Sequence, residues 1–205
     1  IFDANGGLVA NAPHVPVHLG SMDKSVAAVI RTRQTTNGNI NMRPGDVFML
    51  NAPYNGGTHL PDITVVTPVF DDAGEKILFF TASRGHHEDI GGLTPGSMTP
   101  RATTIEEEGV YIDTMKIVDA GTFLEDDVHQ LLTSARYPAR QPGKNIADLK
   151  AQIAANAHGT HELNKMIAQF GINVVQAYMG HVQDHAEESM RRLISNLDSG
   201  HFQTT

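Results

Sequence analysis

The hydrophobic pattern of the chain changes from strand-like to helix-like near residue 125. Three near-continuous apolar runs of strand length precede that point: DVFMLNA (46–52), DITVVTPVF (62–70) and KILFFTAS (76–83). Such runs are typical of strands covered on both faces, since alternation with polar residues is lost when neither face meets water. The pattern predicts one continuous α+β domain, with a mixed, β-sheet-rich part over 1–125 and a long helical hairpin within 126–205.

Shorter elements are expected at the start of the chain. IFDANGGLVA predicts a hairpin whose tight turn uses Asn5, Gly6 and Gly7, because such turns need residues that tolerate positive φ. Ser21 is expected to cap a short helix. The apolar side of that helix is formed by Met22, Val26, Ala27 and Ile30.

Two long helices are expected from residue 145 onward. Asn145 is predicted to cap the first, and Gly171 stands where a glycine commonly follows a helix. Asn173, with Gln176 three residues later, is predicted to start the second. Apolar residues recur at helical spacing at Ile146, Leu149, Ile153, Ala157, Leu163 and Ile167, and then at Val174, Tyr178, Val182, Met190, Leu193 and Leu197. We expect the two helices to pack this apolar stripe as a hairpin.

Two clusters of polar residues lie at one end of the central apolar runs. The first, GGTHLPD, leads into the run at 62–70, and the second, SRGHHEDIGG, follows the run at 76–83. The connection DDAGE between the runs contains glycine and is short enough for an antiparallel hairpin. Both clusters are therefore expected at the same end of that hairpin.

The pairing register decides which side chains meet. If the residues flanking the turn pair directly, Asp62 lies near Arg84 and His59 lies near His87, with a slip of one or two residues permitted by the loop. Adjacent side chains on a strand point to opposite faces, so only one of His86 and His87 is expected to join the cluster.

His59, Asp62 and one of these two histidines form a candidate metal site of two imidazoles and one carboxylate. This set suits Mn²⁺, Zn²⁺ or Fe²⁺ better than Mg²⁺, which prefers oxygen ligands. The alternative is a hydrogen-bonded network at a strand end, in which Asp62 caps a turn and His59 bonds to backbone.

Two other segments hold candidate chemistry. NAPHVPVHLGSM (11–22) places His14 and His18 before a helix N-terminus, where backbone N–H groups can receive an anion; His18 as a core histidine is the alternative. GGLTPGSM (91–98) is rich in glycine and proline, so it forms either a wall of a pocket or a simple turn.

Composition narrows the functional classes. The 205 residues are 40% hydrophobic and 19% charged, which is typical of a globular domain, and the net charge of -8 argues against nucleic acid or anionic membrane as a partner. There is no cysteine, so a metal must be held by histidine and carboxylate. The sequence shows no membrane-length apolar run, signal peptide, Walker A loop or GxSxG elbow, and a cytoplasmic location is expected.

The sequence resembles the hydantoinase B/oxoprolinase family, most closely its 5-oxoprolinase branch. The resemblance rests on blocks along nearly the whole chain: FDANGGLVANAPHVPVHLGSM, MRPGDVFMLNAPYNGGTHLPDITVVTPVF, FFTASRGHHEDIGGLTPGSM, RQPGKNIADLKAQIAANAHGTHELNKMIAQFG and VVQAYMGHVQDHAEESMRRLI. The chain starts with Ile1 and opens directly into a strand-like segment, so we expect a piece of a longer protein, the N-terminal section of a hydantoinase B-like portion.

The resemblance implies an ATP-dependent cyclic-amide hydrolase that converts 5-oxo-L-proline to L-glutamate, a step of glutathione metabolism. It places ATP and Mg²⁺ on a hydantoinase A-like portion outside this segment, so the isolated segment is expected to be inactive. Other members imply alternatives: hydrolysis of N-methylhydantoin, or a subunit of an acetone or acetophenone carboxylase. A non-catalytic module that holds the hydantoinase A-like portion is a further alternative.

The resemblance also assigns roles to individual residues. It implies a divalent transition metal held by His59, Asp62 and His86. His87 or His18 is expected to pass a proton to the leaving nitrogen. The expected partners are the small lactam substrate, the hydantoinase A-like portion, and further copies of the chain in a homo-oligomer.

Overall fold

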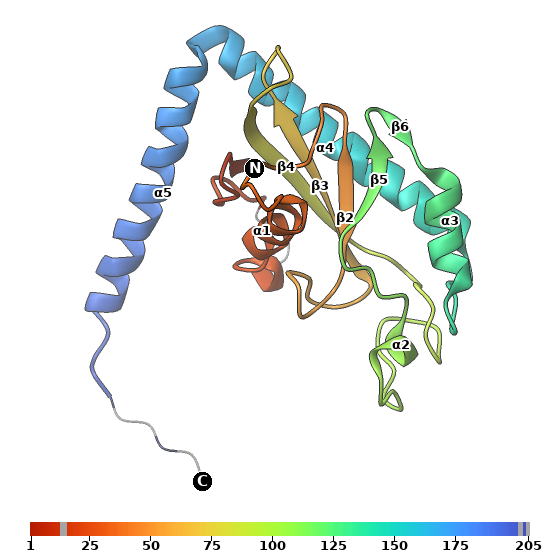
Figure 1. Cartoon of the computed structure of the whole chain (residues 1–205). Helices are drawn as coiled ribbons and strands as arrows, with labels where there is room; N and C mark the ends of the chain where they lie inside the picture. The colour runs from red at the N-terminus through yellow and green to blue at the C-terminus, as the bar shows by residue number, and fades with distance from the viewer. Residues whose placement is uncertain (13–15, 201–202, 204–205) are drawn as a thin grey trace.

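The computed structural model describes residues 1–12, 16–200 and 203. A six-stranded antiparallel sheet forms its centre, in the order β1-β4-β3-β2-β5-β6 (Figure 1). The strands are β1 (Phe2–Asp3), β2 (Val47–Leu50), β3 (Asp62–Phe70), β4 (Ile77–His86), β5 (Met115–Asp119) and β6 (Thr122–Phe123). The helices are η1, a 3-10 turn (Pro16–His18), α1 (Met22–Arg33), α2 (Ile105–Glu108), α3 (Glu125–Ser134), α4 (Pro142–Phe170) and α5 (Ile172–Ser195). The predicted α+β class is confirmed.

Apolar side chains cover both faces of the sheet. On one face, Ile63 and Val65 of β3 pack against α3 and α4. On the other face, Val66 of β3 and Phe48 of β2 pack against α1. All four residues of β2 are buried, as expected for a strand covered on both sides. The central apolar runs are therefore core strands, as their pattern predicted.

The pairing of β3 with β4 differs from the predicted register by two residues. Asp62 pairs with His86, and Thr64 pairs with Arg84. One residue of the difference arises at the turn, where Phe70 pairs with Ile77, and the second arises at the irregularity between Val69 and Phe70. The shift lies within the predicted slip of one or two residues, and both polar clusters meet at one end of the hairpin, as predicted.

Of the two predicted helix caps, one has the predicted position and the other was wrong. Ser21 is the residue before α1, as predicted, but its hydroxyl donates to the carbonyl of His18 at 3.0 Å and makes no capping hydrogen bond. Asn145 lies inside α4, which starts three residues earlier at Pro142 with Gln141 before it. Both side chains make tertiary contacts, Ser21 with Arg84 and Asn145 with His87.

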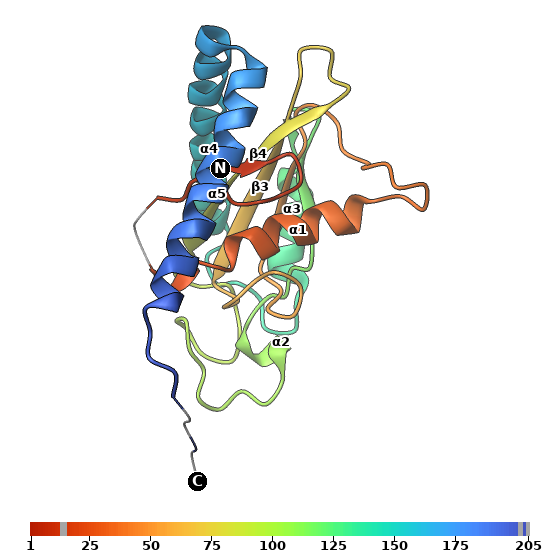
Figure 2. The same ribbon diagram turned by 90° about the vertical axis from the view of Figure 1, so that its left-hand side faces the viewer.

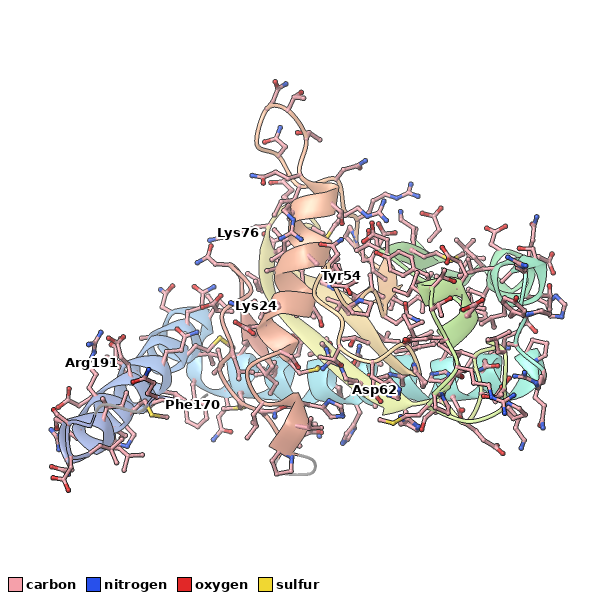
Figure 3. The ribbon with its side chains drawn as sticks, turned by 90° about the horizontal axis from the view of Figure 1, so that it is seen from below. Lys24, Tyr54, Asp62, Lys76, Phe170 and Arg191 are labelled. Atoms are coloured by element: carbon pink, nitrogen blue, oxygen red, sulfur yellow. The ribbon has the colours of Figure 1, made fainter. Side chains whose placement is uncertain are left out.

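Helices α4 and α5 form the predicted hairpin around Gly171, but the predicted burial along α5 was wrong. Val175 and Met179 are buried against β4 and the N-terminal segment. The side chains expected inside are exposed: Val174, Tyr178, Val182, Met190, Leu193 and Leu197. Figure 3 shows that α5, which carries Arg191, extends away from the sheet. Asn173 lies in the first turn of α5 and does not precede it.

The N-terminal hairpin lies beside α5 (Figure 2). Its turn has the predicted character, since Gly6 has φ +86° and the Asp3 carboxylate accepts the N–H groups of Asn5 and Gly7. Gln183 of α5 donates to the same carboxylate at 2.8 Å. His14, which was predicted to precede the helix N-terminus together with His18, lies outside the described residues. Among the described residues, no helix is long and apolar enough to cross a membrane.

The paired glycines that precede His59 fix the loop in front of β3. Gly56 has φ +87°, and a Cβ there would fall 2.5 Å from the carbonyl oxygen of Lys24. A Cβ on Gly57 would fall 2.1 Å from the carbonyl oxygen of Asn51. Only glycine permits these approaches, so the loop is held against both α1 and the end of β2.

We expect Gly57→Ala to lower the free energy of unfolding by about 2–4 kcal/mol, because the added Cβ overlaps a backbone oxygen. Urea denaturation measures the change. Gly180→Ala is the matched control, since a Cβ at this position of α5 meets nothing within 4 Å. Equal stability of the two variants would contradict the packing described for the loop.

Candidate functional site

Asn51 holds the segment that carries His59. Its buried side chain donates to the carbonyls of Leu60 at 2.8 Å and Val110 at 2.9 Å, and it accepts the N–H of Ile112 at 2.7 Å. All its hydrogen-bonding positions face backbone, so the end of the loop is fixed relative to the core. The sequence did not predict this role of Asn51. The only local sign of it is that a polar residue directly follows the apolar residues of β2.

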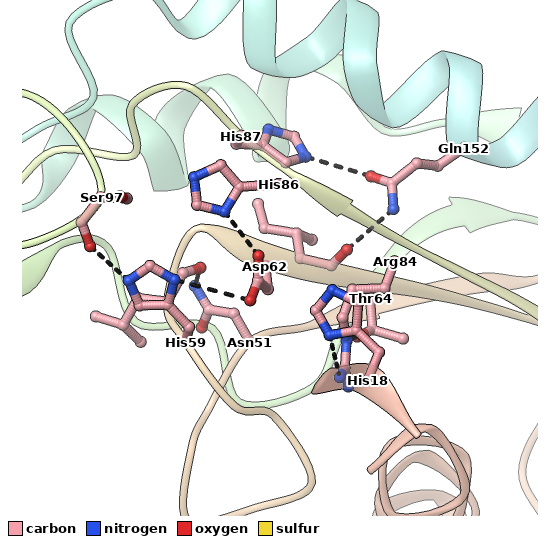
Figure 4. A network of polar contacts seen from close by, with 12 residues as sticks. His18, Asn51, His59, Asp62, Thr64, Arg84, His86, His87, Ser97 and Gln152 are labelled. Atoms are coloured by element: carbon pink, nitrogen blue, oxygen red, sulfur yellow. Dashed lines mark hydrogen bonds and ion pairs between the residues drawn. The ribbon is translucent and has the colours of Figure 1, made fainter. Parts of the chain in front are cut away.

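His59, Asp62 and His86 converge at the end of the β3–β4 hairpin (Figure 4). The N–H of Asp62 donates to the carbonyl of His59 at 2.8 Å, which turns both side chains toward the same side. His86 Nδ1 lies 2.8 Å from Asp62 Oδ1, and His59 Nδ1 lies 3.7 Å from Asp62 Oδ2. The two imidazole rings stack with their centroids 5.6 Å apart. Asp62 is buried, whereas half of the His86 side chain is exposed.

The contact of His59 with Ser97 defines which ring nitrogen faces the carboxylate. His59 Nε2 lies within hydrogen-bonding distance of the carbonyl oxygen of Ser97, which only accepts hydrogen bonds. Nε2 must therefore carry the proton, and in the neutral ring Nδ1 presents a lone pair toward Asp62. A metal-binding histidine commonly donates its other N–H to a carbonyl in this way.

The three side chains fit a divalent cation in type and in spacing. Each offers a ligand atom, and these atoms lie within 4.8 Å of one another. Ligands about 2.1 Å from a shared ion lie roughly 3–4 Å apart, so small side-chain rotations suffice to bind one. A lone pair of His59 that faces a carboxylate is repelled unless a proton or a cation lies between them. The donor set of two nitrogens and one carboxylate suits Mn²⁺, Zn²⁺ or Fe²⁺.

His87 points to the opposite face of the sheet, as the alternation along a strand predicted. It is 1% exposed; its Nε2 contacts Gln152 Oε1 at 3.2 Å, and its Nδ1 contacts Asn145 Nδ2 at 3.1 Å. Because the amide nitrogen of Asn145 only donates, Nδ1 is the acceptor and Nε2 carries the proton. Burial lowers the pKa of His87 below its usual value, while the bond to Gln152 acts in the opposite sense. The ring is therefore neutral, with both nitrogens engaged inside the protein.

His18 lies near Arg84 on the same face of the sheet as His59, Asp62 and His86, the candidate metal-binding group. Its Nδ1 is 3.4 Å from Arg84 Nη1 (Figure 4). Arg84 also donates to Thr64 Oγ1 at 2.8 Å. His18 is half-buried at the end of η1, so it is not the core histidine considered as the alternative.

A pocket of about 490 Å³ opens beside His59. Its lining includes Ser97 and Met98, so the segment 91–98 forms part of a pocket wall and is more than a simple turn. Two paired glycines anchor that segment: a Cβ on Gly91 would fall 2.1 Å from the carbonyl oxygen of Tyr137, and one on Gly92 would fall 2.7 Å from that of Glu108. The wall is therefore built on a tightly packed base.

Together, the fold and the site define a class of protein: an antiparallel α+β domain that presents two imidazoles and a carboxylate at one end of its central hairpin. The hydantoinase B/oxoprolinase family matches residues 1–205, and the chain belongs to this family.

Several known proteins are similar to the chain. 5-Oxoprolinase 1 of Arabidopsis thaliana is 46% identical over an alignment of 205 positions that covers 96% of this chain and 16% of that protein. The 5-oxoprolinase of Saccharomyces cerevisiae is 41% identical, covering 100% of this chain and 16% of that protein. The chain therefore spans only 16% of the length of these relatives.

Two solved structures share the fold. The crystal structure of the ATP-dependent caprolactamase from Pseudomonas jessenii has a TM-score of 0.76 and 32% identity, covering 90% of this chain and 30% of that chain. The nucleotide-free structure of acetone carboxylase has a TM-score of 0.73 and covers 88% of this chain and 23% of that chain. Its 21% identity supports the fold alone.

The buried neutral state of His87 predicts a pH dependence of stability. Its pKa is lowered in the folded protein, so below about pH 6.5 the unfolded chain binds a proton that the folded chain does not, and the free energy of unfolding falls. We expect a fall of up to about 1.4 kcal/mol per pH unit from this group, which His87→Gln removes. Urea denaturation at neutral and mildly acidic pH measures both slopes, and equal slopes in the two proteins would contradict the assignment.

Proposed function

We propose that this chain is the metal-carrying section of a longer, ATP-dependent 5-oxoprolinase. The observation that supports the proposal is the convergence of His59, Asp62 and His86 in a chain that is 41–46% identical to proteins named 5-oxoprolinase. The longer enzyme would hydrolyse 5-oxo-L-proline to L-glutamate. ATP and its Mg²⁺ would bind to a hydantoinase A-like portion outside this segment.

The chemistry requires activation of a stable amide. The lactam C–N bond has partial double-bond character, so its carbon resists attack by water. Transfer of the terminal phosphoryl group of ATP to the lactam oxygen makes that carbon electrophilic. Water then adds to the carbon and loses a proton, and the C–N bond breaks as the ring nitrogen takes up a proton, which leaves an acyl phosphate. A second water attacks this acyl phosphate and releases inorganic phosphate and the carboxylate. The products are the open-chain amino acid, ADP and phosphate.

Different residues of this chain would have different roles in the hydrolytic step. His59, Asp62 and His86 would hold the cation, which supplies a Lewis acid that lowers the pKa of water. Ser97 orients the His59 ring through its carbonyl. His18 would pass a proton to the leaving nitrogen, because it lies on the same face of the sheet as the metal-binding group. His87 is the alternative predicted proton donor. To act as one, it would first have to break its hydrogen bond to Gln152 or to Asn145.

The similarity to a caprolactamase supports a second candidate within the same chemistry. That structure is 32% identical and has the same fold, so a different cyclic amide is the rival substrate. Glutamate release from 5-oxoproline, measured against ring opening of caprolactam and hydantoin by the longer enzyme, separates the candidates. Preferred opening of another ring would retain the hydrolytic site and reject 5-oxoproline as the substrate.

Metal content tests the central part of the proposal. We expect the longer enzyme, purified without chelator, to hold about one transition-metal ion per chain at this site. His59→Ala and Asp62→Asn should lose the ion and lower kcat about 100-fold or more. His185→Ala is the matched control, since this exposed histidine on α5 belongs to no such cluster.

Two results would reject the metal-carrying role. One is an enzyme that is active without a transition metal, and the other is a His59→Ala variant with unchanged turnover. Either result would favour the non-catalytic alternative, in which this segment only supports the hydantoinase A-like portion.

We further propose that the exposed half of α5 packs against another part of the longer protein. Leu193 lies 18 residues, about five helical turns, after Val175, so it continues the stripe that is buried at the start of α5. It is 58% exposed, because no other described element lies beneath it. The relatives contain much more chain than these 205 residues, and that additional chain is the proposed cover.

The variant Leu193→Asp tests this contact, because its effect on stability should differ between the longer protein and the isolated 205 residues. In the longer protein we expect the charge to lower the melting temperature by several degrees and to increase hydrogen exchange along α5, because a buried charge lacks a partner. In the isolated 205 residues the same change should have little effect. His181→Asp, on the polar side of α5, is the control, and a similar effect of Leu193→Asp in both contexts would contradict the contact.

A further inference from the structure

The guanidinium of Arg84 is a partly buried cation without a carboxylate partner among the described residues. Some other arginines of the chain have such partners: Arg140 binds Asp89, and Arg43 lies 2.6 Å from Asp119. Burial lowers the pKa of Arg84, while the charge of Asp62 acts in the opposite direction. A cation withdrawn from water without a paired anion is unfavourable, which suggests that the partner is a ligand.

Neutral side chains hold the Arg84 guanidinium in place. Its Nη1 donates to Ser21 Oγ at 2.6 Å, its Nη2 to Ser25 Oγ at 2.7 Å, and its Nε to Thr64 Oγ1. The serines are themselves fixed, since Ser21 donates to the carbonyl of His18 and Ser25 to that of Gly56. The guanidinium is therefore oriented before any ligand arrives, which lowers the entropic cost of binding.

The guanidinium still has an N–H group available to bind an oxyanion. It has five N–H groups, of which three donate to hydroxyls and one meets His18 Nδ1 at the long distance of 3.4 Å. The fifth has no partner among the described residues. A carboxylate that accepts the fifth N–H and displaces His18 would gain charge-assisted hydrogen bonds.

The position of Arg84 relates this cation to the metal-binding group. Asp62 pairs with His86, and Thr64 pairs with Arg84 two residues further along the hairpin, so all four side chains lie on one face. Two residues along a strand correspond to about 7 Å. That spacing suits a small ring whose amide carbonyl is at the metal-binding group and whose substituent reaches the guanidinium.

We propose that Arg84 binds the carboxylate of the lactam substrate and thereby selects cyclic amides that carry a carboxylate beside the ring nitrogen. The inference rests on the proposed function, since it concerns the substrate of the same site. It assigns Arg84 to substrate binding and specificity. A lactam without a carboxylate would leave the guanidinium without its anion.

Binding of two matched ligands to the longer protein tests the proposal without turnover. Calorimetry in the absence of ATP compares 5-oxo-L-proline with its neutral primary amide. We expect Arg84→Gln to weaken binding of the carboxylate about tenfold or more, with binding of the amide changed less than about twofold. Arg84→Lys keeps the charge and should retain part of the preference. Arg43→Gln is the control, because it removes an equal charge on the exposed turn beside Asp119.

Each contrary result has a distinct meaning. The carboxylate contact would be overturned if Arg84→Gln weakened binding of the carboxylate and of the amide equally, and if Arg84→Lys did not restore the preference for the carboxylate. Loss of binding of inorganic phosphate, with binding of 5-oxo-L-proline unchanged, would overturn it as well and assign Arg84 to a phosphoryl group. If the unmodified longer protein binds neither ligand and opens no lactam, the proposed function itself fails.

Discussion

The antiparallel pairing of β3 with β4 is the constraint on which the candidate site depends. It sets Asp62 opposite His86 and Thr64 opposite Arg84, so the candidate metal-binding group and the guanidinium of Arg84 occupy one face of one hairpin. A shift of one residue would turn these side chains toward α4 and bring apolar residues to the site. The register is therefore as important for the proposed chemistry as the identity of the ligands.

Helix α4 stabilises this register from the opposite face. Gln152 donates to the carbonyls of Ile63 at 2.9 Å and Ser83 at 3.2 Å, which links both strands of the hairpin. The same side chain contacts His87, whose neighbour His86 belongs to the candidate metal-binding group. Buried polar networks of this kind are costly when incomplete, so they favour one arrangement strongly over its alternatives. The network positions the ligands without contacting them.

Local patterns were sufficient to predict part of this structure. The apolar runs gave the core strands, and the short turn DDAGE brought His59, Asp62 and the paired histidines to one end of the hairpin. The register required the irregularity at Val69, which has no local signature. The role of Gln152 in linking β3 and β4 could not be predicted from the sequence either, because it depends on how α4 crosses the sheet. The exposure of Leu193 follows from what lies next to α5 in space, which periodicity does not contain.

We propose that His59, Asp62 and His86 hold one divalent transition-metal ion in the longer enzyme. Anomalous X-ray diffraction, recorded above and below the absorption edge of the metal, tests this assignment. We expect a single strong anomalous peak between these three side chains that disappears in Asp62→Asn. A catalytically active crystal without a peak there, or with its transition metal at another site, would contradict the assignment.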